Sequence, residues 1–144
     1  LVARFLSAYH DDFFARYHRL VRADNYVTRR KSLRLLGDVL LDRSHFSTMT
    51  RYIASADNLE IVMRALLDPS VAIQLEAFHV FKVCVANPRK QPRVLAVLLR
   101  NQHALLNFLR HFQPDAKLLN ETFGEDRRLV FREIESLTGQ HAVV

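Results

Sequence analysis

A helix-length segment of the chain, Glu76 to Pro88 (EAFHVFKVCVANP), is apolar on nearly every side. A helix at a protein surface normally keeps one polar face, so this composition indicates a helix enclosed by other helices. The same core pattern lies 45 positions earlier, where Ser32 corresponds to Ala77. The further pairs are Leu33 with Phe78, Leu35 with Val80, Leu36 with Phe81, Val39 with Cys84 and Leu40 with Val85.

The segments that precede these two helices align at nearly the same spacing, 45 or 46 residues. The matched sets are Phe14, Leu59 and Leu105; Tyr17, Val62 and Phe108; and Val21, Leu66 and Phe112. A period of about 40–47 residues with two or three helices is typical of armadillo and HEAT arrays. The sequence therefore predicts an all-α, armadillo/HEAT-like right-handed helical-repeat solenoid. An ordinary helical bundle is the alternative.

A last helix fits the pattern at a shift of 53, which predicts a longer loop after Phe112. Its core positions are Val130, Phe131, Ile134 and Leu137. Turn and breaker residues divide the chain into helices. The predicted spans are Ser7–Arg22, Tyr26–Leu41, Phe46–Ala54, Asn58–Leu67, Val71–Ala86, Pro92–Arg100, Gln102–Phe112 and Glu121–Leu137. Asp57 and Glu60 have the spacing of a capping box, and Ser70 is placed to cap the quoted helix.

Composition agrees with one helical domain over residues 1–144, because the chain has only three Gly and four Pro. A single cysteine, and apolar runs far shorter than the roughly 18 residues of a membrane span, predict a reducing, cytoplasmic location without membrane insertion. The chain starts without Met and with an apolar stretch, LVARFLSAY. We therefore expect the C-terminal fragment of a longer solenoid.

Sequence motifs for catalysis or cofactor binding are missing. The chain has no phosphate-binding glycine loop, no H-E-x-x-H and no EF-hand loop. His10, Asp11 and Asp12 are consecutive, so in a helix they point in different directions, and we interpret them as a helix start or a solvated face. Cys84 occupies a core position, where burial makes a thiol a poor nucleophile. We expect no enzyme activity, no cofactor and no metal.

The net charge of +6 and the pI near 10.0 permit nucleic-acid binding, with a local cluster of Arg29, Arg30, Lys31 and Arg34. The other basic residues are dispersed, as on an ordinary solvated surface. Arg30 and Arg34 are four residues apart and share one helical stripe. The equivalent positions of the next repeat are Leu75 and His79, so the predicted exposed stripe is partly basic and partly apolar. Such a stripe suits a protein partner.

Three long stretches carry a family resemblance: NYVTRRKSLRLLGDVLLDR, QLEAFHVFKVCVANP and VLLRNQHALLNFLRHF. The chain resembles the C-terminal portion of the calcium-binding protein 39 family. The resemblance implies a non-enzymatic signalling scaffold that binds sterile-20-related kinases or pseudokinases and stabilises their active conformation. It also implies a three-part complex with the kinase upstream of AMP-activated kinase.

The resemblance implies two binding surfaces. Arg30, Arg34 and Phe46 would contact the kinase fold from the concave face, with Tyr26 nearby. A second set, Met63 and Arg100, matches residues around a pocket for a tail of the Trp-Glu-Phe type. Two positions depart from the family pattern: Glu60 replaces an expected basic residue, and Ala104 replaces a longer side chain.

Two other functions stay open from the sequence. The first is a basic helical-repeat module that binds nucleic acid. The second is self-association through an apolar N-terminal edge formed by Leu1, Phe5 and Leu6.

Overall fold

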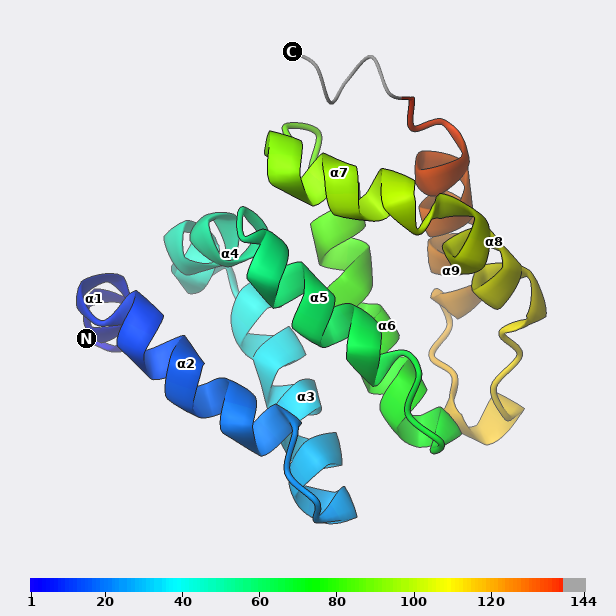
Figure 1. Ribbon diagram of the computed structural model, residues 1–144. Coiled ribbons are helices and arrows are strands. Elements are labelled where there is room, and N and C mark those ends of the chain that lie inside the picture. The colour runs from blue at the N-terminus through cyan, green and yellow to red at the C-terminus, as the bar shows by residue number, and fades with distance from the viewer. Residues whose placement is uncertain (139–144) are drawn as a thin grey trace.

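The computed structural model describes residues 1–138, and every regular element in that range is helical (Figure 1). Two short 3₁₀ turns lie at Arg43–His45 and Ala116–Leu118. The helices are α1 (Val2–Ala8), α2 (His10–Val21), α3 (Tyr26–Leu41), α4 (Phe46–Ile53), α5 (Ala56–Ala65), α6 (Val71–Ala86), α7 (Pro92–Arg100), α8 (Gln102–His111) and α9 (Phe123–Glu135). None of the helices in the described range is long and apolar enough to cross a membrane.

These helices form units of three: α1 to α3, α4 to α6, and α7 to α9. The third helix of each unit packs against the third helix of the next, α3 on α6 and α6 on α9 (Figure 1). Within each unit the second helix packs against the third. Helices α3 and α6 both contain 16 residues, and their first residues are 45 positions apart. The predicted all-α helical-repeat architecture is confirmed.

Helix α6 is enclosed because α3, α5 and α9 all pack against it. A Cβ atom at Gly37 of α3 would lie 3.7 Å from Cγ2 of Val80, so Val80 packs directly on the neighbouring unit. The equivalent residue of α3, Leu35, is 53% exposed, since nothing in the described part of the chain covers that side of α3. The buried residues of α6 are Ile73, Leu75, Ala77, Phe78, Val80, Phe81, Cys84 and Val85.

Side-chain caps fix the starts of the inner helices. The Oδ1 atom of Asn25 accepts a hydrogen bond from the Thr28 amide at 3.0 Å, and Oγ of Ser70 accepts one from the Ile73 amide at 3.4 Å. The predicted cap at Ser70 is therefore confirmed. The predicted capping box at Asp57 is wrong, because Ser55 caps α5 and Asp57 lies inside its first turn. Ser55, the polar residue directly before α5, therefore predicts the start of this helix better than the Asp57–Glu60 spacing does.

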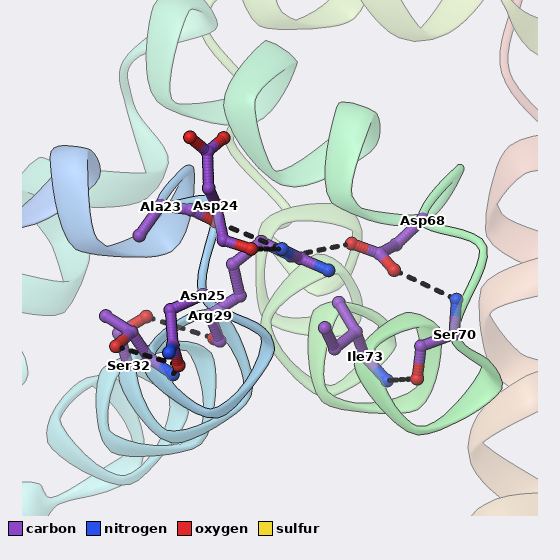
Figure 2. Close-up of polar contacts among 9 residues, drawn as sticks. Ala23, Asp24, Asn25, Arg29, Ser32, Asp68, Ser70 and Ile73 are labelled. Carbon is purple, nitrogen blue, oxygen red and sulfur yellow. Dashed lines mark hydrogen bonds and ion pairs between the residues drawn. The ribbon is translucent and has the colours of Figure 1, made fainter.

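An arginine clasp joins the first two units (Figure 2). The Nε atom of Arg29 donates to Oδ2 of Asp68 at 3.0 Å, and its Nη1 donates to the backbone oxygens of Ala23 and Asp24. The other carboxylate oxygen of Asp68 accepts from the Ser70 amide at 2.9 Å. One guanidinium group thus connects the loop before α3 to the loop before α6.

The start of the chain differs from the sequence prediction, whereas the connection between α8 and α9 agrees with it. The first helix is broken at Tyr9 into α1 and α2, whereas one helix beginning at Ser7 was predicted. Leu6 is buried, so it is not part of an exposed N-terminal edge, although Leu1 and Phe5 are exposed. Between α8 and α9 the structure contains the long connection that the shift of 53 predicted.

Candidate functional site

The shared face of α3 and α6 contains a polar hollow of about 390 Å³. Arg30 and Arg34 line it from α3, and His79 and Lys82 line it from α6. The loop before α9 closes one side with Lys117, Leu118 and Asn120. The structure therefore brings Arg30 and Arg34 together, as their four-residue spacing predicts. It also adds basic side chains from two other segments.

Two carboxylates, Glu76 from α6 and Asp38 from α3, also line this hollow. Burial raises the pKa of the Glu76 carboxyl, and the nearby Arg34 and Arg30 guanidinium groups partly offset that rise. Burial also lowers the pKa of His79; the positive charge of Lys82 acts in the same direction, and the negative charge of Asp126 acts against it. Four Lys and Arg side chains line the hollow against Glu76 and Asp38, and Asp126 pairs with one of them, Lys82, so positive charge remains in excess and the hollow is suited to an acidic surface.

Tyr26 and Arg34 are both exposed, but the stripe of exposed residues on α3 does not continue onto α6 as the sequence predicted. Nη1 of Arg30 lies 3.4 Å from the Tyr26 hydroxyl oxygen, so these two side chains are neighbours. Leu75, the counterpart of Arg30 in the second unit, is buried. The prediction of an exposed apolar residue there is wrong, because α6 is enclosed by the helices α3, α5 and α9. His79, the counterpart of Arg34, does line the hollow.

Phe46 lines a second, more apolar hollow of about 760 Å³ between α4, α6 and α9. Its ring is 67% exposed, so Phe46 is not a core anchor. Leu129 of α9 and Met49 of α4 extend the apolar lining. Leu41 and Lys82 border both hollows, which makes them one continuous surface. We call the combined lining of the two hollows, with Arg30 at one end and Leu129 at the other, the α3–α6 face.

Lys82 is a functional candidate that the sequence reasoning missed. Its Nζ atom lies 2.9 Å from Oδ2 of Asp126, so it joins α6 to α9 at the centre of the α3–α6 face. The signal was present, because Lys82 is the one Lys or Arg in the otherwise apolar stretch HVFKVCVA. Leu41 and Leu129 gave no such signal, since an exposed leucine cannot be told from a core leucine by periodicity alone.

Different helices build a separate pocket of about 350 Å³. Met63 lines it from α5, Arg100 from the end of α7, and Phe108 from α8. Glu60 and Ala104, the two positions that depart from the family pattern, also line this pocket. Four residues that the sequence analysis connected with one pocket, and that span 45 positions, therefore surround the same cavity. We call it the α5–α8 pocket.

The α5–α8 pocket has an apolar interior and a charged rim. Met63 is half-buried and packs against the core, yet it also lines the cavity. Oε1 of Glu60 lies 3.7 Å from Nη2 of Arg100, and both side chains reach solvent. Apolar walls with a few polar groups at the edge are typical of sites that hold a short segment of another molecule.

Two side chains with reactive groups, Cys84 and His10, are buried. Cys84 is buried, and burial raises the pKa of its thiol to about 12, so the predicted core role is confirmed. His10 begins α2 and is buried, whereas Asp11 and Asp12 are exposed in the first turn. Within residues 1–138, no group of three or more His, Cys, Asp or Glu side chains is placed to hold a metal ion.

Comparison with known proteins gives consistent matches along the whole described range. The sequence model of the family described as Mo25-like matches residues 1–138. The chain is 48% identical to the Mo25-like protein of Schizosaccharomyces pombe over 136 residues, which is 94% of this chain and 41% of that protein.

Animal and filamentous-fungal relatives match over a similar range. Identity to the human protein named calcium-binding protein 39-like is 44% over 137 residues, 95% of this chain and 40% of that protein. Identity to the conidiophore development protein hymA of Emericella nidulans is 42% over 138 residues, 95% of this chain and 36% of that protein. The chain thus spans about two fifths of the length of these relatives.

Proposed function

Because the chain belongs to the Mo25-like family, we propose that it is a cytoplasmic, non-catalytic scaffold that binds and activates a sterile-20-like kinase or pseudokinase. Family membership and the helical-repeat architecture support the scaffold role, since such arrays present long surfaces to other proteins. The kinase upstream of AMP-activated kinase is a proposed third member of the assembly.

The observation that carries the proposal is the continuity of the α3–α6 face. Arg30 and Arg34 stand at its basic end and Phe46 at its apolar end, and Leu41 and Lys82 connect the two. Arginine and exposed aromatic side chains are enriched among residues that dominate binding energies. We assign the kinase fold to this face, with Tyr26 beside Arg30 as a further contact.

The second contact in this proposal is the α5–α8 pocket, which receives a partner tail of the Trp-Glu-Phe type. An apolar interior around Met63 suits aromatic side chains, and Arg100 at the rim suits a carboxylate. The pocket shares no lining residue with either hollow of the α3–α6 face. Two separate contacts on one rigid array raise the affinity of a partner that can occupy both.

Activation in this mechanism needs no chemistry from the scaffold. A protein that binds the active conformation of a kinase more tightly than the inactive one shifts the population toward the active state. The shift equals the difference between the two binding free energies, so a change from 1% to 99% active requires about 5.5 kcal/mol. The α3–α6 face must therefore recognise a feature that only the active arrangement presents.

The direct test combines Arg30→Ala with Phe46→Ala and measures affinity for a purified sterile-20-like kinase by calorimetry. We expect at least about a hundredfold loss, because each residue is of the kind that contributes about 2 kcal/mol or more at an interface. Arg16→Ala with Leu20→Ala on α2 is the matched control, since both are exposed and outside the face. Equal affinities for parent and double variant would remove the α3–α6 face from the proposal.

A separate measurement tests the pocket and the nucleic-acid alternative. Met63→Ala should weaken a peptide ending in Trp-Glu-Phe by about tenfold, because it removes part of the apolar wall. Unchanged peptide affinity would dismiss the pocket. A gel shift with DNA or RNA that fades steeply as salt rises would instead support nucleic-acid binding.

A further inference from the structure

The rim of the α5–α8 pocket carries an acidic and a basic side chain next to each other. Glu60 projects from α5, and Arg100 projects from the last turn of α7. A second arginine, Arg64, lies one helical turn after Glu60 and also lines the pocket. The same pocket is also lined by the apolar side chains of Met63, Leu66 and Phe108. The charged groups are therefore concentrated where the flanks of a bound segment would lie.

The Glu60 carboxylate already pairs with Arg100, so it competes with any ligand carboxylate for that guanidinium group. Its Oε1 atom is 3.7 Å from Nη2 of Arg100, within the range of an ion pair. The Glu60 side chain is 45% exposed and that of Arg100 is 67% exposed, so both can turn toward a ligand. An ion pair this exposed contributes little to folding, about 0–1 kcal/mol. Its main effect is on the charge that a ligand meets.

We propose that Glu60 determines the charge specificity of the pocket. It pairs with Arg100 and so competes with a ligand carboxylate, which means that the pocket gains less affinity from the charge of an acidic tail than Arg64 and Arg100 would give without Glu60. The inference rests on the proposed function, in which the pocket receives a partner tail. An acidic tail must either displace Glu60 from Arg100 or lie beside it as a like charge. A tail without carboxylates meets neither cost and still fills the apolar interior.

Ala104, on another wall of the pocket, adds no charge to the rim. It lies on α8 and is exposed, so this wall offers only a methyl group at the rim. Among the rim residues, Arg64 and Arg100 are then the positive groups available to a ligand, and Glu60 offsets one of them. Arg64 attracts a ligand carboxylate and Glu60 repels it. The affinity of the parent for an acidic tail therefore reports which of these two effects is larger.

The experiment compares two peptides that share length and sequence except at their charges. One ends in Trp-Glu-Phe with a free carboxyl terminus, and the other ends in Trp-Gln-Phe with a terminal amide. Affinities are measured by fluorescence anisotropy at low and high salt for the parent and for Glu60→Gln. Asp57→Asn is the matched control, because it removes the same charge from α5 without changing the pocket lining.

We expect the parent to bind the two peptides with affinities within about threefold of each other, because Glu60 offsets the charge of Arg100. Glu60→Gln should increase affinity for the acidic peptide by about fivefold at low salt and for the uncharged peptide by less than about twofold. The gain should shrink at high salt because surface charges are screened. Asp57→Asn should leave the ratio of the two affinities unchanged.

Two results would overturn the inference, and they differ in what else they reject. If both peptides bind and Glu60→Gln leaves their affinity ratio unchanged, Glu60 does not set specificity, while the pocket keeps its proposed role. If neither peptide binds the parent or Glu60→Gln, the proposed tail-binding function of the pocket fails as well. A melt within about 1 °C of the parent confirms that Glu60→Gln acts on binding and not on folding.

Discussion

Helices α3 and α6 occupy the same place in successive units, yet one presents a surface and the other is enclosed. They share their length, a side-chain cap at the first turn and the core positions that repeat every 45 residues. Leu35 is exposed whereas its counterpart Val80 is buried, and Arg30 is replaced by the buried Leu75. Location in the array, rather than helix-forming tendency, therefore decides which outward positions are free to bind a partner.

The largest difference in stability should come from placing a charge at Val80, which is buried, and at its exposed counterpart Leu35. Val80→Asp should destabilise the protein by about 4 kcal/mol or more, because a carboxylate would be placed against α3 without water or a partner. Leu35→Asp should change the free energy of unfolding by about 0.5 kcal/mol or less, since that position is exposed. Urea denaturation measures both. Similar losses for the two variants would contradict the contrast.

A smaller effect on stability should come from His18 of α2 and should depend on pH, whereas its counterpart in α5, Met63, does not titrate. His18 is the counterpart of Met63, and its Nε2 lies 2.9 Å from the Tyr52 hydroxyl in a buried contact. Burial, followed by the charge of Arg22, lowers the pKa of His18 from 6.5 to about 4. The unfolded chain therefore binds more protons than the folded chain between these two values, so stability should fall as pH decreases through that window.

The matched variant for this prediction is His18→Met, which places the α5 residue type in α2. It should flatten the decline in melting temperature between pH 6.5 and pH 4. Some decline should remain because burial, and then Arg51, also lowers the pKa of nearby His10, although Asp11 acts in the opposite direction. An equally steep decline in parent and variant would show that His18 does not control the acid response.

The smallest effects should come from the helix caps, where α3 and α6 are alike. Asn25→Ala and Ser70→Ala should each cost about 1 kcal/mol, because each removes a side-chain acceptor from a helix amide. Ser55→Ala should cost a similar amount, whereas Asp57→Ala should cost only a few tenths through the helix dipole. Thermal unfolding would compare them. A larger loss for Asp57→Ala than for Ser55→Ala would restore the capping box predicted from sequence.

The sequence predicted the parts of the fold that depend on local periodicity. Burial at Phe78, Phe81 and Cys84 follows from the spacing of apolar residues, and the start of α6 follows from Ser70. The break at Tyr9 was missed because Leu6 and His10 are both buried and continue one apolar pattern across it. A backbone turn that leaves the apolar spacing intact gives no periodic signal.

The candidate sites were predicted less evenly. Arg30 and Arg34 could be paired because their spacing lies within one helix. The neighbourhood of Phe46, with Lys82 and Leu129 from other units, depends on how the units are rotated relative to one another, and spacing along the chain does not contain that rotation. Resemblance to relatives supplied Met63 and Arg100 for one pocket, but the contact between Glu60 and Arg100 required coordinates.

The most direct test of the central claim is hydrogen–deuterium exchange of the protein with and without a sterile-20-like kinase. If the α3–α6 face holds the kinase fold, amides in α3, the start of α4 and the loop before α9 should exchange more slowly in the complex, while those of α2 stay unchanged. Protection confined to α2 or α7, or no protection at any kinase concentration, would contradict the account.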